Sequence, residues 1–165
     1  MDNPWILALA YWLHLIATVL WIGGLTALGL LVIPAARRTL QPPDYSRLLA
    51  EIQKRLDPLG WFCLAVLAGT GMFQLSASPN YTGFLQIEST WGIAMLVKHG
   101  LFFSMAALSA YLTWGLLPAL RRAALRQAKD PAEAARLEQR NTQLLRLDLV
   151  LSLLILALTA LARAS

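Results

Sequence analysis

Residues 5–33 read WILALAYWLHLIATVLWIGGLTALGLLVI, an apolar run in which His14 is the one side chain that titrates near neutral pH. An apolar run of more than about 18 residues is typical of a helix that spans a lipid bilayer. An ionisable residue inside such a helix is costly to leave in lipid, so it is by default a functional-site hypothesis. The other histidine, His99, follows Lys98 inside another long apolar run. Both histidines are therefore predicted to lie within the membrane.

The composition agrees with a membrane protein. Hydrophobic residues make up 58% of the 165 residues and charged residues only 14%, which is too apolar for a soluble domain. The formal charge of +5 is what basic cytoplasmic loops produce, and it implies no nucleic-acid partner. The single cysteine, Cys63, excludes an internal disulfide and is predicted to be core packing. We therefore expect a multi-pass integral protein of the plasma (inner) membrane, with the lipid bilayer as its surroundings.

Four apolar runs predict four spans. They cover about residues 5–33, 58–76, 91–117 and 144–162, so the expected fold is all-α, a four-helix transmembrane bundle in a single domain over residues 1–165. The first span lacks the basic start of a signal peptide, and we expect it to be retained. Asp57-Pro58 predicts the start of the second helix, and Pro118 predicts the end of the third. Residues 44–56 have the pattern of an amphipathic cytoplasmic helix, which either rests in the headgroup region or forms a solvated linker.

The distribution of basic residues predicts the orientation. The stretch from Arg37 to Arg55 holds five Lys and Arg residues, and the stretch from Arg121 to Arg146 holds seven. Loops rich in Lys and Arg stay on the cytoplasmic side of the membrane. Both termini are therefore expected on the outer side.

The two histidines are predicted to share one depth in the membrane. At about 1.5 Å per residue from the interfacial markers Trp5 and Trp91, His14 lies about 14 Å down the first helix and His99 about 12 Å down the third. The first and third helices of an up-and-down bundle occupy diagonal corners, so the imidazoles would face each other across the interior. Two such imidazoles suit a haem b. The leading hypothesis is a bis-His haem b protein that transfers electrons, alone, as a homo-oligomer or as a subunit of a membrane redox complex.

Two further residues are candidates for cofactor binding. Lys98 lies about 100° around the helix from His99, so it either pairs with a haem propionate or an acidic substrate, or extends to the headgroups. Trp21 lies two turns below His14, where it either forms a wall beside a planar ligand or packs as an ordinary core residue.

Each histidine also has other interpretations. An intramembrane histidine is often a hydrogen-bond donor to a neighbouring helix. Methionine together with histidine suits Cu(I), and Met72 lies at a depth that could reach His14 and His99, although methionine in a membrane core is more often a space filler. The alternative hypothesis is therefore copper permeation, with His14 and His99 as the metal ligands.

The sequence also resembles the copper resistance protein D (CopD-like) family of membrane proteins. The residues that carry this resemblance are His14-Leu15 followed by Val19-Leu20-Trp21-Ile22-Gly23-Gly24, Pro34 ahead of a basic pair, and Trp91 followed by Leu96-Val97-Lys98. In layout the chain is also similar to the HemJ-type protoporphyrinogen oxidases, whose intramembrane His and Lys match His14 and Lys98. The resemblances imply copper handling at the outer face of the membrane or haem-dependent oxidation of a porphyrin. Whether the protein is an enzyme stays open.

Overall fold

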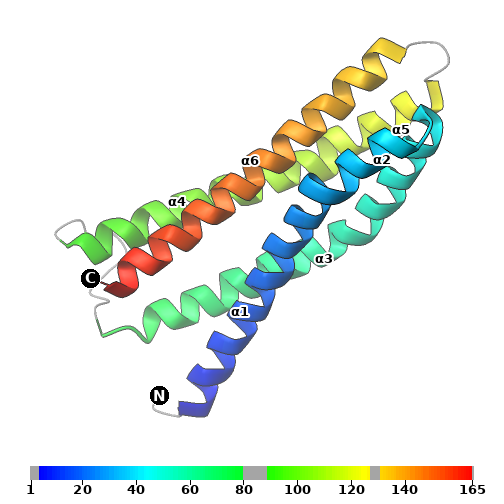
Figure 1. Cartoon of the computed structure of the whole chain (residues 1–165). Helices are drawn as coiled ribbons and strands as arrows, with labels where there is room; N and C mark the ends of the chain where they lie inside the picture. Colours follow the sequence, from blue (N-terminus) through cyan, green and yellow to red (C-terminus); the bar gives the residue numbers. More distant parts are fainter. Residues whose placement is uncertain (1–3, 80–88, 127–130, 165) are drawn as a thin grey trace.

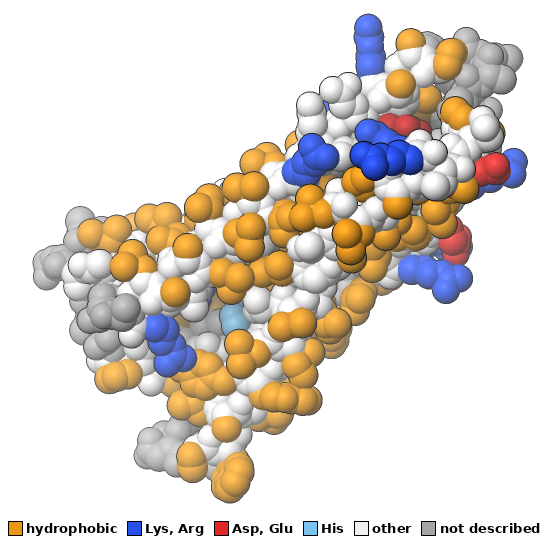
Figure 2. All heavy atoms as spheres, in the orientation of Figure 1, with side chains coloured by type: hydrophobic (Ala, Val, Ile, Leu, Met, Phe, Trp, Pro, Cys, Tyr) orange, Lys and Arg blue, Asp and Glu red, His pale blue; other side chains and the backbone are white. Residues whose placement is uncertain are grey.

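Helices make up nearly all of the chain that the structure, a computed structural model, describes: residues 4–79, 89–126 and 131–164. Four helical segments in these ranges are long and apolar enough to cross a membrane, and they are Pro4–Thr39, Pro42–Ser76, Thr90–Ala123 and Pro131–Arg163. Large apolar side chains such as Leu15, Phe62 and Phe103 are exposed along their flanks (Figure 2), as a lipid-facing surface requires. The expected all-α, four-helix transmembrane bundle is confirmed.

Each span has a distinct make-up. The first consists of α1 (Pro4–Thr26), the π-helical η1 (Ala27–Val32) and α2 (Ile33–Thr39), and the second is α3 (Pro42–Ser76). The third consists of α4 (Thr90–Ala110), the π-helical η2 (Tyr111–Leu116) and α5 (Leu117–Arg126). The fourth is α6 (Pro131–Ala164). Helix α1 packs most extensively against α3, and α4 against α6, with further contact between α1 and α6. The first and third spans are therefore diagonal, as expected.

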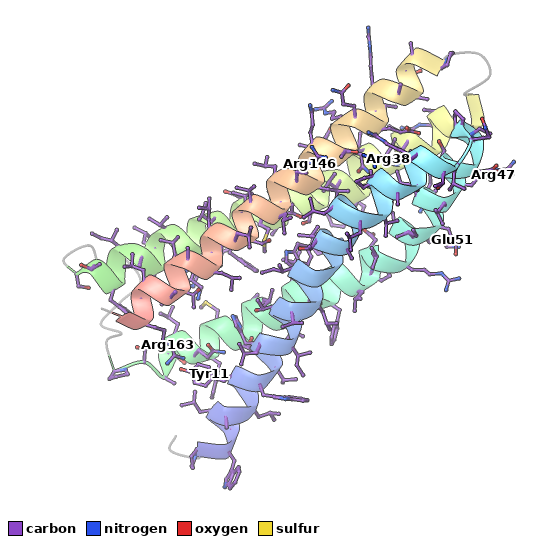
Figure 3. All side chains as sticks on the ribbon, in the orientation of Figure 1. Tyr11, Arg38, Arg47, Glu51, Arg146 and Arg163 are labelled. Carbon is purple, nitrogen blue, oxygen red and sulfur yellow. The ribbon has the colours of Figure 1, made fainter. Side chains whose placement is uncertain are left out.

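The two ends of the bundle differ. We call the end that holds Pro4 and Ala164 the terminal end, and the opposite end, which holds Arg38 and Arg47, the basic end. Towards the terminal end α1 diverges from α4 and α6 (Figure 1). At the basic end Arg38 and Arg47 point away from the helices (Figure 3). The helices thus separate at the end where the histidines lie.

Two prolines do not end their spans, contrary to the sequence-based prediction. Pro34 and Pro118 each follow a six-residue π-helical turn by two positions. Proline has no amide hydrogen, and its ring clashes with the carbonyl four residues earlier. A π turn shifts the hydrogen-bond register at that point, which lets the helix continue. The first and third spans therefore extend to Thr39 and Arg126 instead of ending at residues 33 and 117.

The predicted amphipathic helix 44–56 is not a separate element. It is the first part of α3, which continues through Pro58 to Ser76. Tyr45 and Leu49 are buried in a cluster whose other buried members are Leu28, Ile33, Ala36 and Leu145. The apolar face of this segment therefore packs against the other helices of the bundle. The segment neither rests in the headgroup region nor forms a solvated linker, the two positions expected from the sequence. Asp57 does not cap a new helix, because it lies within α3 and accepts a hydrogen bond from the Thr113 hydroxyl.

Polar contacts join the helices at the basic end. Arg37 donates from Nε to the Tyr45 hydroxyl over 3.2 Å and from Nη2 to the Thr142 hydroxyl over 3.3 Å. Ser46 donates to a Glu138 carboxylate oxygen over 2.8 Å. These bonds tie α2, α3 and α6 together. Because unpaired polar groups are costly near lipid, these hydrogen bonds keep the three helices together at this end.

Gly60 permits the close approach of α1 to α3 in the middle of the bundle. A Cβ at this position would lie 3.2 Å from Cζ3 of Trp21. Gly60→Val is therefore expected to overpack the interface and lower the free energy of unfolding by about 1–3 kcal/mol, measured as a lower thermal midpoint in detergent. Gly69→Val is the matched control, since a Cβ there meets nothing within 4 Å. Equal midpoints for the two variants would contradict this interpretation of Gly60.

Candidate functional site

A hydrogen bond between helices fixes the ring of His14. Its Nδ1 lies 2.8 Å from the hydroxyl oxygen of Thr70 on α3. The Thr70 hydroxyl donates its single hydrogen to the backbone carbonyl of Val66, so it accepts from His14, whose Nδ1 must carry the hydrogen. The Nε2 atom is then the nitrogen with the lone pair. Gly71 lies beside the ring, since a Cβ there would be in ordinary contact with Cε1 of His14, at 3.6 Å.

His99 has the same pattern of protonation but a different partner. Its Nδ1 lies 2.6 Å from the backbone carbonyl oxygen of Met95, one turn earlier on α4. A carbonyl oxygen only accepts, so Nδ1 carries the hydrogen and Nε2 the lone pair of the neutral ring. The Met95 side chain packs against the cluster of Leu75, Trp91, Ala94 and Ala162. His99 is thus oriented by its own helix, whereas His14 is oriented by a neighbouring one.

Lys98 belongs to the same end of the bundle as His14. Its positive charge acts on the His14 imidazole, and the charge of Arg163 acts on Lys98 in turn. The Arg163 guanidinium lies over the Tyr11 ring, 5.0 Å from its centroid (Figure 3). Figure 2 shows a histidine side chain in a hollow on this face, with a cationic side chain nearby. We call His14, Thr70, Lys98 and Arg163 the histidine site, and His99 follows Lys98 on α4.

The other residues considered from the sequence lie elsewhere. The indole Nε1 of Trp21 donates to the Ser152 hydroxyl over 3.0 Å, and its ring lines a cavity deeper in the bundle. Met72 is 47% exposed, which places it largely on the surface of the bundle. Within the described ranges, no three His, Cys, Asp or Glu side chains group closely enough to hold a metal ion. A metal at the histidine site would therefore depend on imidazole nitrogens and on ligands of other types.

The deeper cavity was not expected from the sequence. Its volume is about 120 Å³, and its polar lining consists of Trp21, Gln53, Asp57, Trp61, Ser109, Thr113 and Asp148, with the Cys63 thiol beside them. Asp148 is only 1% exposed. The signal that could have revealed it was present, because Asp148 lies four residues inside the predicted span 144–162 and an ionisable residue there is a functional candidate. Thr70 and Arg163 carried no comparable signal, since neither interrupts an apolar run at depth.

Comparison with known proteins identifies the family. Residues 50–162 match the family described as Copper resistance protein D. The chain belongs to this family. A curated member, Copper resistance protein D of Pseudomonas syringae pv. tomato, is 31% identical over 149 residues, which are 90% of this chain and 45% of that protein. The chain therefore spans about half the length of this CopD relative. No solved structure matches.

The family match confirms one of the two predicted resemblances. The CopD-like resemblance is confirmed, whereas the similarity to HemJ-type oxidases is not shown by these comparisons. The matched range includes Lys98, His99 and Asp148, and His14 precedes it. The protein is thus an integral membrane protein of the CopD family, and the description of that family as copper resistance proteins favours the copper alternative from the sequence over haem.

Proposed function

We propose that the protein moves copper into the membrane bundle from the outer side, and that Cu(I) binds transiently at His14 and His99. The observation that carries this proposal is the hydrogen bond from His14 to Thr70, which turns the ring so that Nε2 is the nitrogen available as a ligand. Imidazole nitrogen is a suitable copper ligand, and a bond to the other ring nitrogen is the usual way in which a metal-binding histidine is held. The basic end is then cytoplasmic by the distribution of Lys and Arg.

The cations near His14 fit a site that must release its ion. The charges of Lys98 and Arg163 repel a bound Cu(I) ion, so they weaken its binding. A permeation site has to bind well enough to admit an ion and weakly enough to let it leave. The proposed copper site combines both features, with the imidazoles of His14 and His99 as ligands that attract the metal and with the cations that limit its residence.

Thr70 provides a specific test of the proposed copper site. Thr70→Val keeps the shape of the side chain but removes the acceptor of the His14 Nδ1 hydrogen, so the copper affinity is expected to fall by about 10–100-fold. The measurement is Cu(I) competition with a chromogenic chelator on the purified full chain in detergent. Thr70→Ser, which keeps the hydroxyl, is the control and should bind like the unchanged protein. If Thr70→Val binds Cu(I) as tightly as the unchanged protein does, the proposal that Thr70 orients His14 as a copper ligand is wrong.

Haem b at the same two histidines is the second candidate. The observation in its favour is also the pair of cations, because Lys98 and Arg163 would suit the carboxylates of haem propionates. The His14 ring donates from Nδ1, which leaves Nε2 as its ligand atom. An absorbance spectrum of the purified protein separates the candidates, because haem gives a Soret band and Cu(I) gives none.

A further inference from the structure

The cavity in the middle of the bundle combines polar groups with space for water. Its volume of about 120 Å³ is room enough for several water molecules, since one water needs roughly 10–15 Å³ of such volume. Two residues of the lining each have a buried acceptor without a hydrogen-bond partner among the described residues: Oε1 of Gln53 and Oδ1 of Asp148. Buried polar atoms are normally paired with protein groups or with ordered water. Water that passed from the cavity to these two atoms would satisfy both.

Asp148 is held by few hydrogen bonds. Its other carboxylate oxygen, Oδ2, lies 3.3 Å from the hydroxyl of Ser109, and that hydroxyl also reaches the backbone carbonyl of Met105 over 3.0 Å. A hydroxyl has one hydrogen to donate. When it is donated to Met105, two oxygen acceptors face each other unless the carboxyl group carries a proton. The geometry around Ser109 therefore accommodates a carboxylic acid when the shorter of the two bonds, to Met105, is made.

The charges around Asp148 point in the same direction. The titratable groups that line the cavity with it are Asp57 and Cys63, both on α3. Helices α1 and α4 and the turn η2 contribute only neutral groups to the lining, among them Trp21, Ser109 and Thr113. Among the described residues, no Lys, Arg or His lines the cavity. An ionised carboxylate would therefore be buried without a partner cation, which is costly in a low-dielectric interior.

We propose that Asp148 is a proton-binding site inside the membrane, reached through the water of this cavity. We infer that this proton exchanges with the copper ion of the function proposed above, on which this step rests. The exchange balances in charge. One Cu(I) ion that enters the bundle adds one positive charge, and one proton that leaves the Asp148 carboxylic acid removes one. Net charge inside the bundle stays constant, which avoids the cost of an unbalanced charge in the bilayer. Proton release thus accompanies copper movement.

Infrared difference spectroscopy on the full chain in lipid vesicles tests the protonation itself. The carbonyl stretching band of a protonated carboxylic acid should be present at neutral pH and lost in Asp148→Asn. Glu51→Gln is the control, because Glu51 is exposed and paired with Arg55 over 3.2 Å, and it should leave the band in place. If Asp148→Asn does not accumulate, Ser109→Ala should shift the same band, since it removes the neighbouring hydroxyl. An unchanged spectrum in these Asp148 and Ser109 variants overturns the proposal.

A second measurement tests the exchange of copper for protons. Vesicles that contain the protein and an internal pH dye receive Cu(I) outside, and proton movement is recorded with copper uptake. Asp148→Asn should lower the copper-driven proton flux by about 100-fold, the lower end of what a positioned proton-transfer group contributes, with copper affinity at the histidine site unchanged. Copper uptake without proton flux in the unchanged protein overturns the exchange but leaves the copper function standing. Absent copper binding and uptake would refute the copper function and the exchange that rests on it, and the infrared band would still decide the protonation of Asp148.

Discussion

His14→Ala is expected to lower the affinity for Cu(I) by more than about 100-fold and to stop copper uptake into vesicles. The change removes a ligand nitrogen, which costs more than the 10–100-fold typical for losing the residue that orients a ligand. It also leaves the Thr70 hydroxyl without its partner at 2.8 Å. Chelator competition measures the affinity, and copper uptake by lipid vesicles that contain the protein measures the transport.

The control separates ligand loss from misfolding. Leu15 is the next residue on α1 and is 63% exposed on the surface of the bundle, so Leu15→Ala should keep both the copper affinity and the thermal midpoint. His14→Ala should keep the midpoint within a few degrees. Copper binding that survives His14→Ala in a folded protein would show that the metal binds elsewhere.

Lys98→Met is expected to change copper and haem binding in opposite directions. The Lys98 charge acts on the His14 imidazole, and like charges repel by about 4 kcal/mol at about 4 Å, or about half of that at twice the distance, when the effective dielectric constant is 20. Removing the Lys98 charge should therefore tighten Cu(I) binding by about 30-fold and slow its release. If the ligand is haem, the same change leaves a propionate without its cation, which costs about 3–5 kcal/mol, and haem is lost. Chelator competition and the Soret band measure the two outcomes.

The conservative variant Lys98→Arg provides the matched control. It keeps the positive charge that acts on His14, so it should leave copper affinity close to its original value. A tighter site in Lys98→Met together with an unchanged one in Lys98→Arg supports the proposed electrostatic role. Equal affinities in all three proteins would show that the lysine is directed to the headgroups and has no part in the site.

The four spans could be predicted because their signal is long and local. An apolar run of about 20 residues has few alternatives in a short chain. The breaks were harder to predict, since proline usually ends a helix, but Pro34 and Pro118 are accommodated by π turns whose hydrogen-bond register the sequence does not indicate. Asp57-Pro58 has the pattern of a helix start, yet α3 continues through it, with Tyr45 and Leu49 buried before the proline and Cys63 and Leu64 buried after it.

The site was predictable only where a residue was unusual for its surroundings. His and Lys are rare in apolar helices, and the charge of Lys98 is close enough to act on the His14 ring. Thr70 is an ordinary residue in a membrane helix, so its bond to His14 depends on how α1 and α3 face each other, which periodicity does not determine. Helical spacing alone made Trp21 a candidate for binding the cofactor beside His14. In the structure its indole donates a hydrogen bond to Ser152 on α6 and lines the deeper cavity.

The two π turns set the angular alignment between the two ends of the bundle. Turn η1 separates His14 from α2, and turn η2 separates Lys98 and His99 from α5. A π turn contains one residue more than the corresponding α turn, and one residue corresponds to about 100° of rotation and about 1.5 Å of rise. Rewinding either turn as α-helix would therefore swing His14, or Lys98 with His99, more than a quarter of a revolution about its helix axis while the basic end stayed fixed. The direction in which each ligand faces is thus determined by backbone winding more than ten residues away along the chain.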